Sequence, residues 1–378
     1  MSLTGPAAGA PIAAPAAVAS AMTAAAADLA ADTARWGTAV QVDGAALLGE
    51  RAALAGLTRQ GSTSVGGAAR FVRTLDGWVV LNLPRPEDVA ALPALVGASV
   101  APDDWPAVAI RLAAMSAEAV VKSATTLGMA AAAPATVEPT ASPGGEIHRG
   151  GPRVVVEHPL VVDLTSLWAG PLLTSLLACA GAHVIKVEGR HRPDGARRGP
   201  APFFDLLNHG KECVAVDFDD PVDIGFLRAL LAAADLVVEG SRPRVMERLG
   251  VDPGRLAADG VSWLSITGHG RTGPAAERIG FGDDAAVAGG LVVDGDPPMF
   301  VADAVADPIA GLAGATLAAD MLATTRASVV DLPLSRAAAW ARSRPVEAPV
   351  RRSAGGWVVD TLEGEVAVAP PRARPVPG

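Results

Sequence analysis

The feature that most constrains the fold is a series of short, almost continuous apolar runs in the second half of the chain. Five runs have the character of strands and alternate with helical segments: 161–164, 184–187, 213–216, 236–238 and 263–266. A strand that is apolar on both faces must be covered on both faces, as in a parallel sheet with helices on each side. The sequence therefore predicts an α/β fold, with ligands bound at the carboxyl ends of the strands.

The first half of the chain has a different pattern. Residues 70–73 and 78–81 are rich in β-forming side chains and flank the turn dipeptide Asp76-Gly77, which predicts a hairpin, and helical stretches follow it. This is a small α+β domain. The predicted division is an Ala-rich N-terminal segment (1–36), the small α+β domain (37–130), a linker (131–152), a large α/β domain (153–345) and a C-terminal tail (346–378).

The composition excludes several classes of function. A net charge of −9 leaves no basic surplus for nucleic acid or an anionic membrane surface. The early Ala-rich stretch lacks a basic start and is broken by prolines, so we expect no export signal there and a helix near 16–36. We therefore expect the protein to be cytoplasmic. The six histidines are scattered, which argues against a metal site. Cys179 and Cys213 lie in apolar stretches and are expected to be buried and reduced.

Two glycine-containing motifs follow strand ends. The segment 163–171 runs from a strand through a tight turn, where the small Ala169 and Gly170 would let a ligand approach the backbone; the alternative is an ordinary βα turn with Pro171 at the helix start. The segment 268–273 matches the G-x-G-x-x-G pattern of dinucleotide-binding folds. It follows the fifth strand and precedes Pro274 instead of a long helix, so we reject a dinucleotide site.

The order of several short strings is more specific than any one of them. They are found at 164–171, 181–188, 208–211, 214–217, 234–239, 242–243, 247–250, 265–268 and 270–274. This succession resembles the family III (CaiB/BaiF-type) CoA-transferases and the related 2-methylacyl-CoA racemases over 161–311. The resemblance implies a Rossmann-like parallel sheet, a small second domain, a homodimer, and transfer of CoA from an acyl-CoA to a carboxylic acid. Coenzyme A would be a substrate, and no tightly bound cofactor is implied.

The resemblance also implies roles for particular residues. Asp307, ahead of a predicted helix, would be the catalytic carboxylate that attacks the thioester, with Asp303 as the reserve candidate. Its alternative role is an ordinary helix N-cap followed by Pro308. The implied coenzyme contacts are Leu167, Trp168, Ala169, Val216, Gly240, Ser241, Arg248 and Leu249. Arg248 suits a phosphate, and its alternative is a solvated arginine at a helix end.

The chain departs from the family pattern in three ways. Asp219 stands where the family has a basic residue near the nucleotide. The pair Gly240-Ser241 stands where the family has an Asn-Phe pair. Phe281-Gly282 stands where the racemases have a His-Asp pair, which argues against an isomerase because racemisation needs an acid and a base. The small domain comes first in the chain, whereas in the family it follows the aspartate. A racemase-type isomerase and a catalytically weak CoA-ester-binding homologue remain the alternatives.

Overall fold

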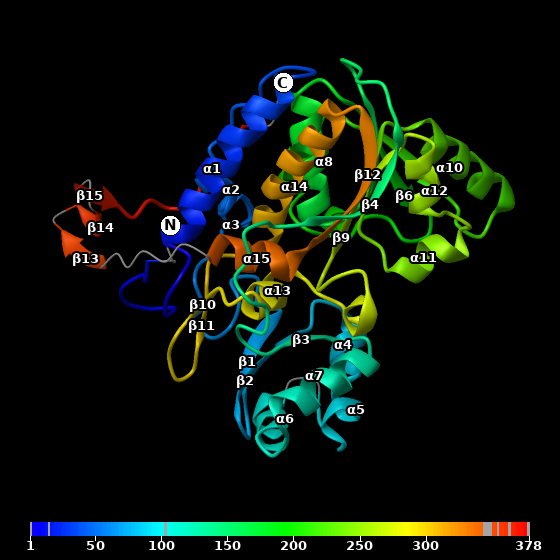
Figure 1. Ribbon diagram of the computed structural model, residues 1–378. Helices are drawn as coiled ribbons and strands as arrows, with labels where there is room; N and C mark the ends of the chain where they lie inside the picture. Colours follow the sequence, from blue (N-terminus) through cyan, green and yellow to red (C-terminus); the bar gives the residue numbers. More distant parts are fainter. Residues whose placement is uncertain are drawn as a thin grey trace.

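The computed structural model describes residues 2–13, 16–101, 104–342, 350–353, 355–361 and 364–375. Its centre is a seven-stranded sheet with the order β4-β12-β9-β8-β5-β6-β7 (Figure 1). The strands are β4 (Gly145–Pro152), β5 (Leu160–Leu164), β6 (His183–Gly189), β7 (Glu212–Val216), β8 (Leu236–Glu239), β9 (Ser262–Thr267) and β12 (Arg326–Pro333). All neighbours are parallel except β4, which pairs antiparallel with β12 at one edge. The predicted α/β class and the five predicted strands are confirmed.

Helices cover both faces of this sheet (Figure 1). One face packs against α1 (Ala16–Thr33), α8 (Ala169–Cys179), α14 (Ala306–Ala323) and α15 (Leu334–Arg342). The other packs against α10 (Pro221–Ala233), α11 (Pro243–Arg248) and α12 (Pro253–Ala258). Val161 faces the first group and Val162 the second, and both are fully buried. This burial of successive residues is why the strands are continuously apolar in sequence.

A smaller α+β unit lies at the bottom of the view in Figure 1. It comprises β1 (Ala69–Thr74), β2 (Gly77–Asn82), β3 (Ala130–Ala132), α4 (Pro86–Ala90), α5 (Leu92–Val96), α6 (Trp105–Leu112) and α7 (Ala117–Thr126) around a core of its own. The hairpin is confirmed, but its two-residue turn is Leu75-Asp76, because Thr74 pairs with Gly77. Asp76 holds this turn by accepting a 2.8 Å hydrogen bond from the Ala117 amide.

The N-terminal segment belongs structurally to the large unit. Helix α1 lies along α14, and the Trp36 indole N–H donates to the Ala319 carbonyl at 3.1 Å. Two short helices follow, α2 (Gly44–Leu47) and α3 (Glu50–Ala55), and their apolar residues join the core that contains α8 and α14. The chain therefore begins on the large unit, crosses to the small unit and returns. The helix predicted over 16–36 ends at Thr33.

Two segments differ from the sequence-based expectations. Residues 145–152, expected as part of a linker, form β4, an edge strand whose mostly exposed, Gly-containing sequence carries no apolar signal. The tail beyond 350 forms a three-stranded sheet of β13 (Val350–Ser353), β14 (Gly356–Thr361) and β15 (Gly364–Ala367). The boundaries of the predicted domains otherwise stay a prediction.

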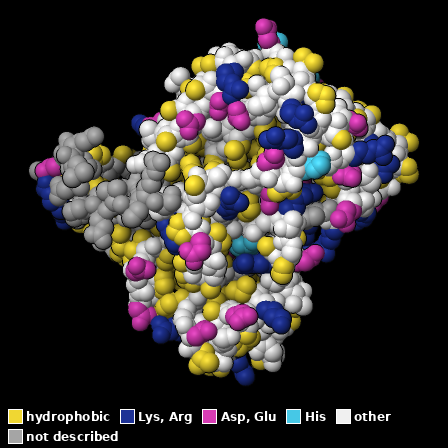
Figure 2. All heavy atoms as spheres, in the orientation of Figure 1, with side chains coloured by type: hydrophobic (Ala, Val, Ile, Leu, Met, Phe, Trp, Pro, Cys, Tyr) yellow, Lys and Arg dark blue, Asp and Glu magenta, His cyan; other side chains and the backbone are white. Residues whose placement is uncertain are grey.

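The surface and the cysteines complete the description. Both cysteines are free and exposed, so their expected burial is wrong: Cys179 ends α8 and Cys213 lies on the edge strand β7. On the face drawn in Figure 2, acidic and basic side chains are interspersed. Over the described ranges, every helix is too short or too polar to cross a bilayer.

Candidate active site

The turn that follows β5 has an unusual backbone. Leu167 adopts a φ of 70°, a left-handed conformation that costs a branched side chain free energy, and its side chain is 42% exposed. Helix α8 begins two residues later at Ala169, so Pro171 is its third residue. Gly170 packs so closely against Thr165 that a β-carbon would clash with the Thr165 side chain. The local sequence therefore fits a turn pressed tightly against its own strand.

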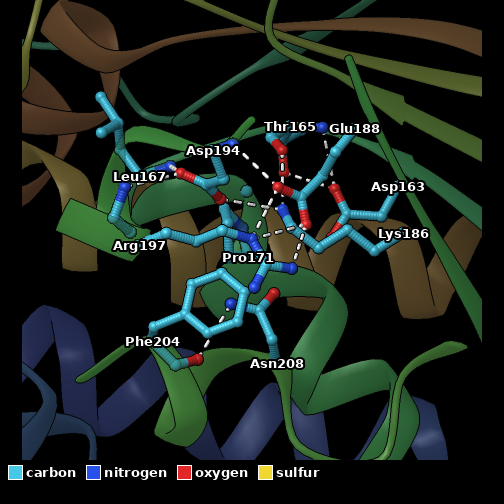
Figure 3. Close-up of polar contacts among 12 residues, drawn as sticks. Asp163, Thr165, Leu167, Pro171, Lys186, Glu188, Asp194, Arg197, Phe204 and Asn208 are labelled. Carbon is cyan, nitrogen blue, oxygen red and sulfur yellow. Dashed lines mark hydrogen bonds and ion pairs between the residues drawn. The ribbon is translucent and has the colours of Figure 1, made fainter. Parts of the chain in front are cut away.

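A buried chain of polar contacts holds the strand side of this turn (Figure 3). The carboxylate of Asp163 accepts hydrogen bonds from the Thr165 amide at 2.9 Å and from the Thr174 hydroxyl at 2.6 Å. Lys211 Nζ lies 3.1 Å from Asp163 Oδ2 and also donates to the Pro171 carbonyl at 2.9 Å. These contacts fasten the end of β5 to the first turns of α8.

A second ion pair holds the other side of the turn (Figure 3). Lys186 Nζ donates to the Thr165 carbonyl at 2.9 Å and pairs with Asp194 Oδ2 at 3.0 Å. Asp194 Oδ1 in turn accepts from the Leu167 amide at 2.9 Å. The two hydrogen bonds fix the backbone on both sides of Ser166 and so maintain the left-handed conformation of Leu167.

The charges under the turn are buried and mutually compensated. The side chains of Asp163, Lys186, Asp194 and Lys211 are all fully buried. Burial alone would raise the pKa of Asp163, but Lys211 and Lys186 hold that pKa well below its usual range. Burial lowers the pKa of Lys211 to about 8, although the Asp163 carboxylate opposes the shift. Removing one partner would leave an uncompensated buried charge, which typically costs about 3–5 kcal/mol.

The predicted coenzyme contacts lie at three places in the large unit. Gly240 and Ser241 follow β8, which pairs with β5, and a β-carbon on Gly240 would lie 3.8 Å from Thr165 Cγ2. They therefore adjoin the Leu167 to Ala169 turn. Val216 ends β7, two strands away from β5, while Arg248 and Leu249 close α11.

These residues differ in what they can offer a ligand. Leu167, Gly240 and Arg248 are exposed, and in the described part of the chain Arg248 forms no ion pair. Val216 and Leu249 are buried in the core that covers the α10 face, so their side chains are not free to contact a ligand. The Ser241 hydroxyl donates to Glu239 at 2.8 Å.

Asp307 lies in the first turn of α14. The N-cap of this helix is Val305, and no side chain caps it, so the alternative role of Asp307 as an N-cap is wrong. The residue is partly exposed, and its carboxylate accepts no hydrogen bond from any residue that the structure describes. Gly282 leaves space for it, because a β-carbon at Gly282 would lie 2.5 Å from Asp307 Oδ2.

Asp307 belongs to a cluster of carboxylates. Asp303 is fully buried and forms a two-point contact with Arg51, at 2.9 Å to Nε and 2.5 Å to Nη2. Asp283 accepts from the Ala304 amide at 3.1 Å, and Asp284 accepts from Asn82 at 2.8 Å. Asp307 is therefore the member whose carboxylate is not held by a hydrogen bond.

The pKa values of two of these groups are strongly raised. Burial raises the pKa of Asp307 to about 7, while the Arg51 guanidinium opposes the shift and the neighbouring carboxylates of Asp283, Asp284 and Asp303 add to it. Burial likewise raises the pKa of Asp283 to about 7, again opposed by Arg51. Two carboxyl groups that are close to half-ionised at neutral pH are typical of sites that carry out chemistry.

The carboxylate cluster and the Leu167 turn lie together. A β-carbon on Gly311, one helical turn after Asp307, would lie 3.0 Å from the Ala169 carbonyl, so the starts of α14 and α8 are in close contact. Arg51, which holds Asp303, also stacks over the Trp168 ring with its guanidinium carbon 5.3 Å from the centroid. The buried Trp168 indole N–H has no acceptor among the described residues.

Sequence reasoning missed several members of this site. Arg51 and Ser64 come from the segment before and at the start of the small unit, and the Ser64 side chain lowers the pKa of Asp283 against the effect of burial. No local signal distinguishes them, because they contact the cluster from about 220 to 250 residues away in sequence. His269 is buried 3.7 Å from Asp284, and neither of its ring nitrogens has a hydrogen-bond partner in the described chain. In the same ranges no cluster of His, Cys, Asp and Glu side chains could hold a metal ion.

Part of the chain matches a known protein family. Residues 158–354, just over half of the chain, match the model of CoA-transferase family III. Succinyl-CoA:glutarate CoA-transferase of Mus musculus is 34% identical over 152 residues, which cover 36% of this chain and 35% of that protein. Acetyl-CoA:oxalate CoA-transferase of Acetobacter aceti is 30% identical over 166 residues, covering 40% of this chain and 43% of that protein.

A solved CAIB/BAIF family protein from Brucella suis aligns over 53% of this chain and 64% of its own, with 26% identity and a TM-score of 0.46. The two curated relatives are matched over only 35% and 43% of their own lengths, so the chain spans less than half of each. The family match includes the β5 turn, every strand of the parallel sheet and the Asp307 helix. On this match, the chain belongs to the family III CoA-transferases.

Proposed function

We propose that the protein transfers CoA from an acyl-CoA to a carboxylic acid, with Asp307 as the covalent nucleophile. The observation that carries the proposal is the state of the Asp307 carboxylate. It is partly exposed, it is free of hydrogen bonds within the described chain, and it lies at the start of a helix that touches the Trp168 turn. A carboxylate with no fixed partner can attack an electrophile, whereas one held by an arginine fork cannot do so without losing that contact.

The chemistry balances with one carboxylate and no external reagent. An Asp307 oxygen attacks the thioester carbon of the donor, the C–S bond breaks, and a mixed anhydride and CoA thiolate form. The thiolate then attacks the Asp307 acyl carbon, releasing the donor acid and leaving CoA on Asp307 as a thioester. The acceptor carboxylate repeats these steps in reverse order, which regenerates the Asp307 carboxylate.

The turn beside Asp307 would bind the coenzyme. Leu167 is exposed on a backbone held by hydrogen bonds, at the end of the turn that leads into the N-terminus of α8. The amide groups of a helix N-terminus suit phosphate or thioester oxygens. The unpaired Trp168 indole N–H is a donor that a bound ligand could satisfy. By resemblance to the family we further propose that the enzyme is a cytoplasmic homodimer. Size-exclusion chromatography with light scattering would test the dimeric state.

The named activities of the relatives suggest the first substrates to test. The protein would be incubated with succinyl-CoA or acetyl-CoA, in the presence of glutarate or oxalate, and trapped with hydroxylamine or borohydride. Mass spectrometry should find the modification on the peptide that contains Asp307. The matched control is the variant Asp320→Asn, because Asp320 is an exposed carboxylate on the same helix and should not affect trapping.

Two outcomes would contradict the proposal. An unmodified Asp307 across a broad acyl-CoA panel would instead support a CoA-ester-binding homologue without transferase activity. Exchange of the α-proton of the acyl group without CoA transfer would support the isomerase, for which no histidine stands at the Phe281 position.

A further inference from the structure

Arg51 connects the N-terminal segment to the carboxylate cluster. We propose that Arg51 is a positioning residue for the Asp307 nucleophile, because it supplies positive charge to the cluster and fastens the loop that leads into α14. The inference rests on the proposed function, since it assigns Arg51 a role in the attack by Asp307. It goes beyond that function, since Arg51 lies outside the segment that matches the family, in the part of the chain before the small unit.

The contacts of Arg51 are those of a rigid clamp. Its fork binds Asp303 through two nitrogens, while its planar face lies over Trp168. The Arg51 side chain is 29% exposed and Asp303 is fully buried, so this pair is held in place at the margin of the core. A single side chain thus ties the loop before Asp307 to the turn proposed to bind the coenzyme.

The loop that carries Asp303 needs such support. Ala302 and Ala304 both adopt left-handed backbone conformations, with φ values of 50° and 42°, which alanine rarely adopts. Residues far away in sequence hold them there: the Ala302 amide donates to the Thr4 hydroxyl at 3.0 Å, and the Phe300 amide donates to the Gly61 carbonyl at 2.9 Å. The N-terminal segment therefore shapes the loop, and Arg51 is its charged contact.

A buried ion pair of the neighbouring residue also limits the movement of Arg51. Its neighbour Glu50 is fully buried and pairs with Arg374 at 3.0 Å, so the tail of the chain contacts α3. Burial raises the pKa of Glu50, and Arg374 opposes the shift. Helix α3 thus contacts the tail through Glu50 and the carboxylate cluster through Arg51. These two contacts limit how far Arg51 can move.

The charges around Asp307 give Arg51 its electrostatic role. The carboxylates facing Asp307 are Asp283, Asp284 and Asp303, and the cation facing it is Arg51. Loss of the guanidinium would raise the pKa of Asp307 further above about 7, and a larger fraction of Asp307 would be protonated at neutral pH. A protonated carboxyl group is a poor nucleophile, so the rate should fall most on the acid side of the pH profile.

The test uses the full chain and four proteins: wild type, Arg51→Met, the double variant Arg51→Met with Asp303→Asn, and the control Arg35→Met. Arg35 lies in an exposed ion pair and should have no effect. The measured quantities are kcat and KM for acyl-CoA across pH 5.5 to 9 and the yield of trapped Asp307. In Arg51→Met we expect the acid limb to move up by about one pH unit, with kcat at pH 6.5 about tenfold lower and KM little changed.

The double variant separates the electrostatic role from a merely structural one. Arg51→Met alone leaves Asp303 as an unpaired buried carboxylate and could unfold the loop, whereas the double variant removes both charges. We expect the double variant to fold, with a thermal midpoint close to wild type, and still to show an upward shift of the acid limb, smaller than in the single variant.

Two results overturn the inference in different ways. If the double variant has the wild-type pH profile, Arg51 only neutralises Asp303, and the proposed function is unaffected. If wild-type protein forms no Asp307 adduct with any acyl-CoA, the proposed function fails and the role of Arg51 fails with it.

Discussion

The Leu167 turn and the Asp307 loop lie next to each other but use charge in opposite ways. Under the turn, the buried cations Lys186 and Lys211 are matched by the buried carboxylates Asp163 and Asp194, and each ion pair also holds backbone. Around Asp307, the three carboxylates of Asp283, Asp284 and Asp303 are opposed by Arg51, and the carboxylate of Asp307 itself has no hydrogen-bond donor among the described residues. The paired charges under the Leu167 turn make the turn rigid. The excess of negative charge around Asp307 leaves the carboxylate of that residue without a fixed partner.

The largest effect should come from removing the unsatisfied carboxylate. Asp307→Asn keeps the shape of the side chain but replaces the nucleophile with an amide, so CoA transfer should fall at least about a thousandfold in kcat. Because Asp307 accepts no hydrogen bond from the described chain, and because its raised pKa means that its ionised form is disfavoured by burial, the variant should be at least as stable as wild type in urea. Chromatography of the CoA products measures the first quantity, and substantial residual transfer would place the nucleophile elsewhere.

The next largest effect concerns the stability of the turn. Lys211→Met leaves the Asp163 carboxylate with one fewer counter-charge in a buried site, and should lower the free energy of unfolding by about 3–5 kcal/mol. Urea titration measures it. Lys122→Met, at an exposed position in α7, is the matched control and should change stability by less than about 0.5 kcal/mol. A loss of less than about 1 kcal/mol in Lys211→Met would mean that the pairing under the turn does not require Lys211.

A glycine substitution tests the space around Asp307. In Gly282→Ala the new methyl group would meet Asp307 Oδ2 and the Ala304 carbonyl, so we expect a loss of about 1–3 kcal/mol in stability together with a large loss of activity. Gly225→Ala, in the exposed middle of α10 with no atom near the added methyl, should instead stabilise the protein by about 0.5–1 kcal/mol. Equal effects of the two substitutions would contradict the close packing at Gly282.

The smallest predicted effect depends on pH. The pKa of Asp283 is raised to about 7 in the fold, so between about pH 4 and 7 the folded protein binds more protons than the unfolded chain. Its contribution to stability is therefore favourable at low pH and is lost as the pH rises through 7. Asp283→Asn mimics the neutral form, and should be about 1–2 kcal/mol more stable than wild type at pH 8 but nearly equal at pH 4. Urea titrations at the two pH values measure the difference, and a variant that is less stable at pH 8 would contradict the sign.

The sequence predicted the centre of the fold better than its margins. The strands β5 to β9 were predicted because their sequences are almost continuously apolar, and the Leu167 turn and Asp307 were proposed as site residues from the family resemblance. The edge strand β4 was missed because most of its side chains are exposed and glycines replace apolar residues. The burial of Cys179 was wrongly predicted because its Ala and Leu neighbours belong to a helix that is buried only up to Leu177.

Several residues of the candidate site could not be predicted from their local sequence. Arg51, Ser64 and Asp283 meet only in the folded chain, and each of their local sequences is consistent with an ordinary helix or loop. The N-cap alternative for Asp307 was equally consistent with local rules, and only the position of the helix start at Ala306 decides against it. Long-range packing, which a single sequence does not disclose, determines which carboxylate is left free.

The contact between Trp36 and Ala319 has a consequence for synthesis of the protein. Helix α1 leaves the ribosome early, but α14, against which it packs, is made almost three hundred residues later. At typical translation rates of about 5–20 residues per second, the apolar surface of α1 waits for tens of seconds before its partner exists. The core that α4 to α7 form with β1 to β3 is complete by residue 132, so this part of the small unit can fold during that interval. Helix α1 therefore stays without its main packing partner in the nascent chain until α14 has been translated.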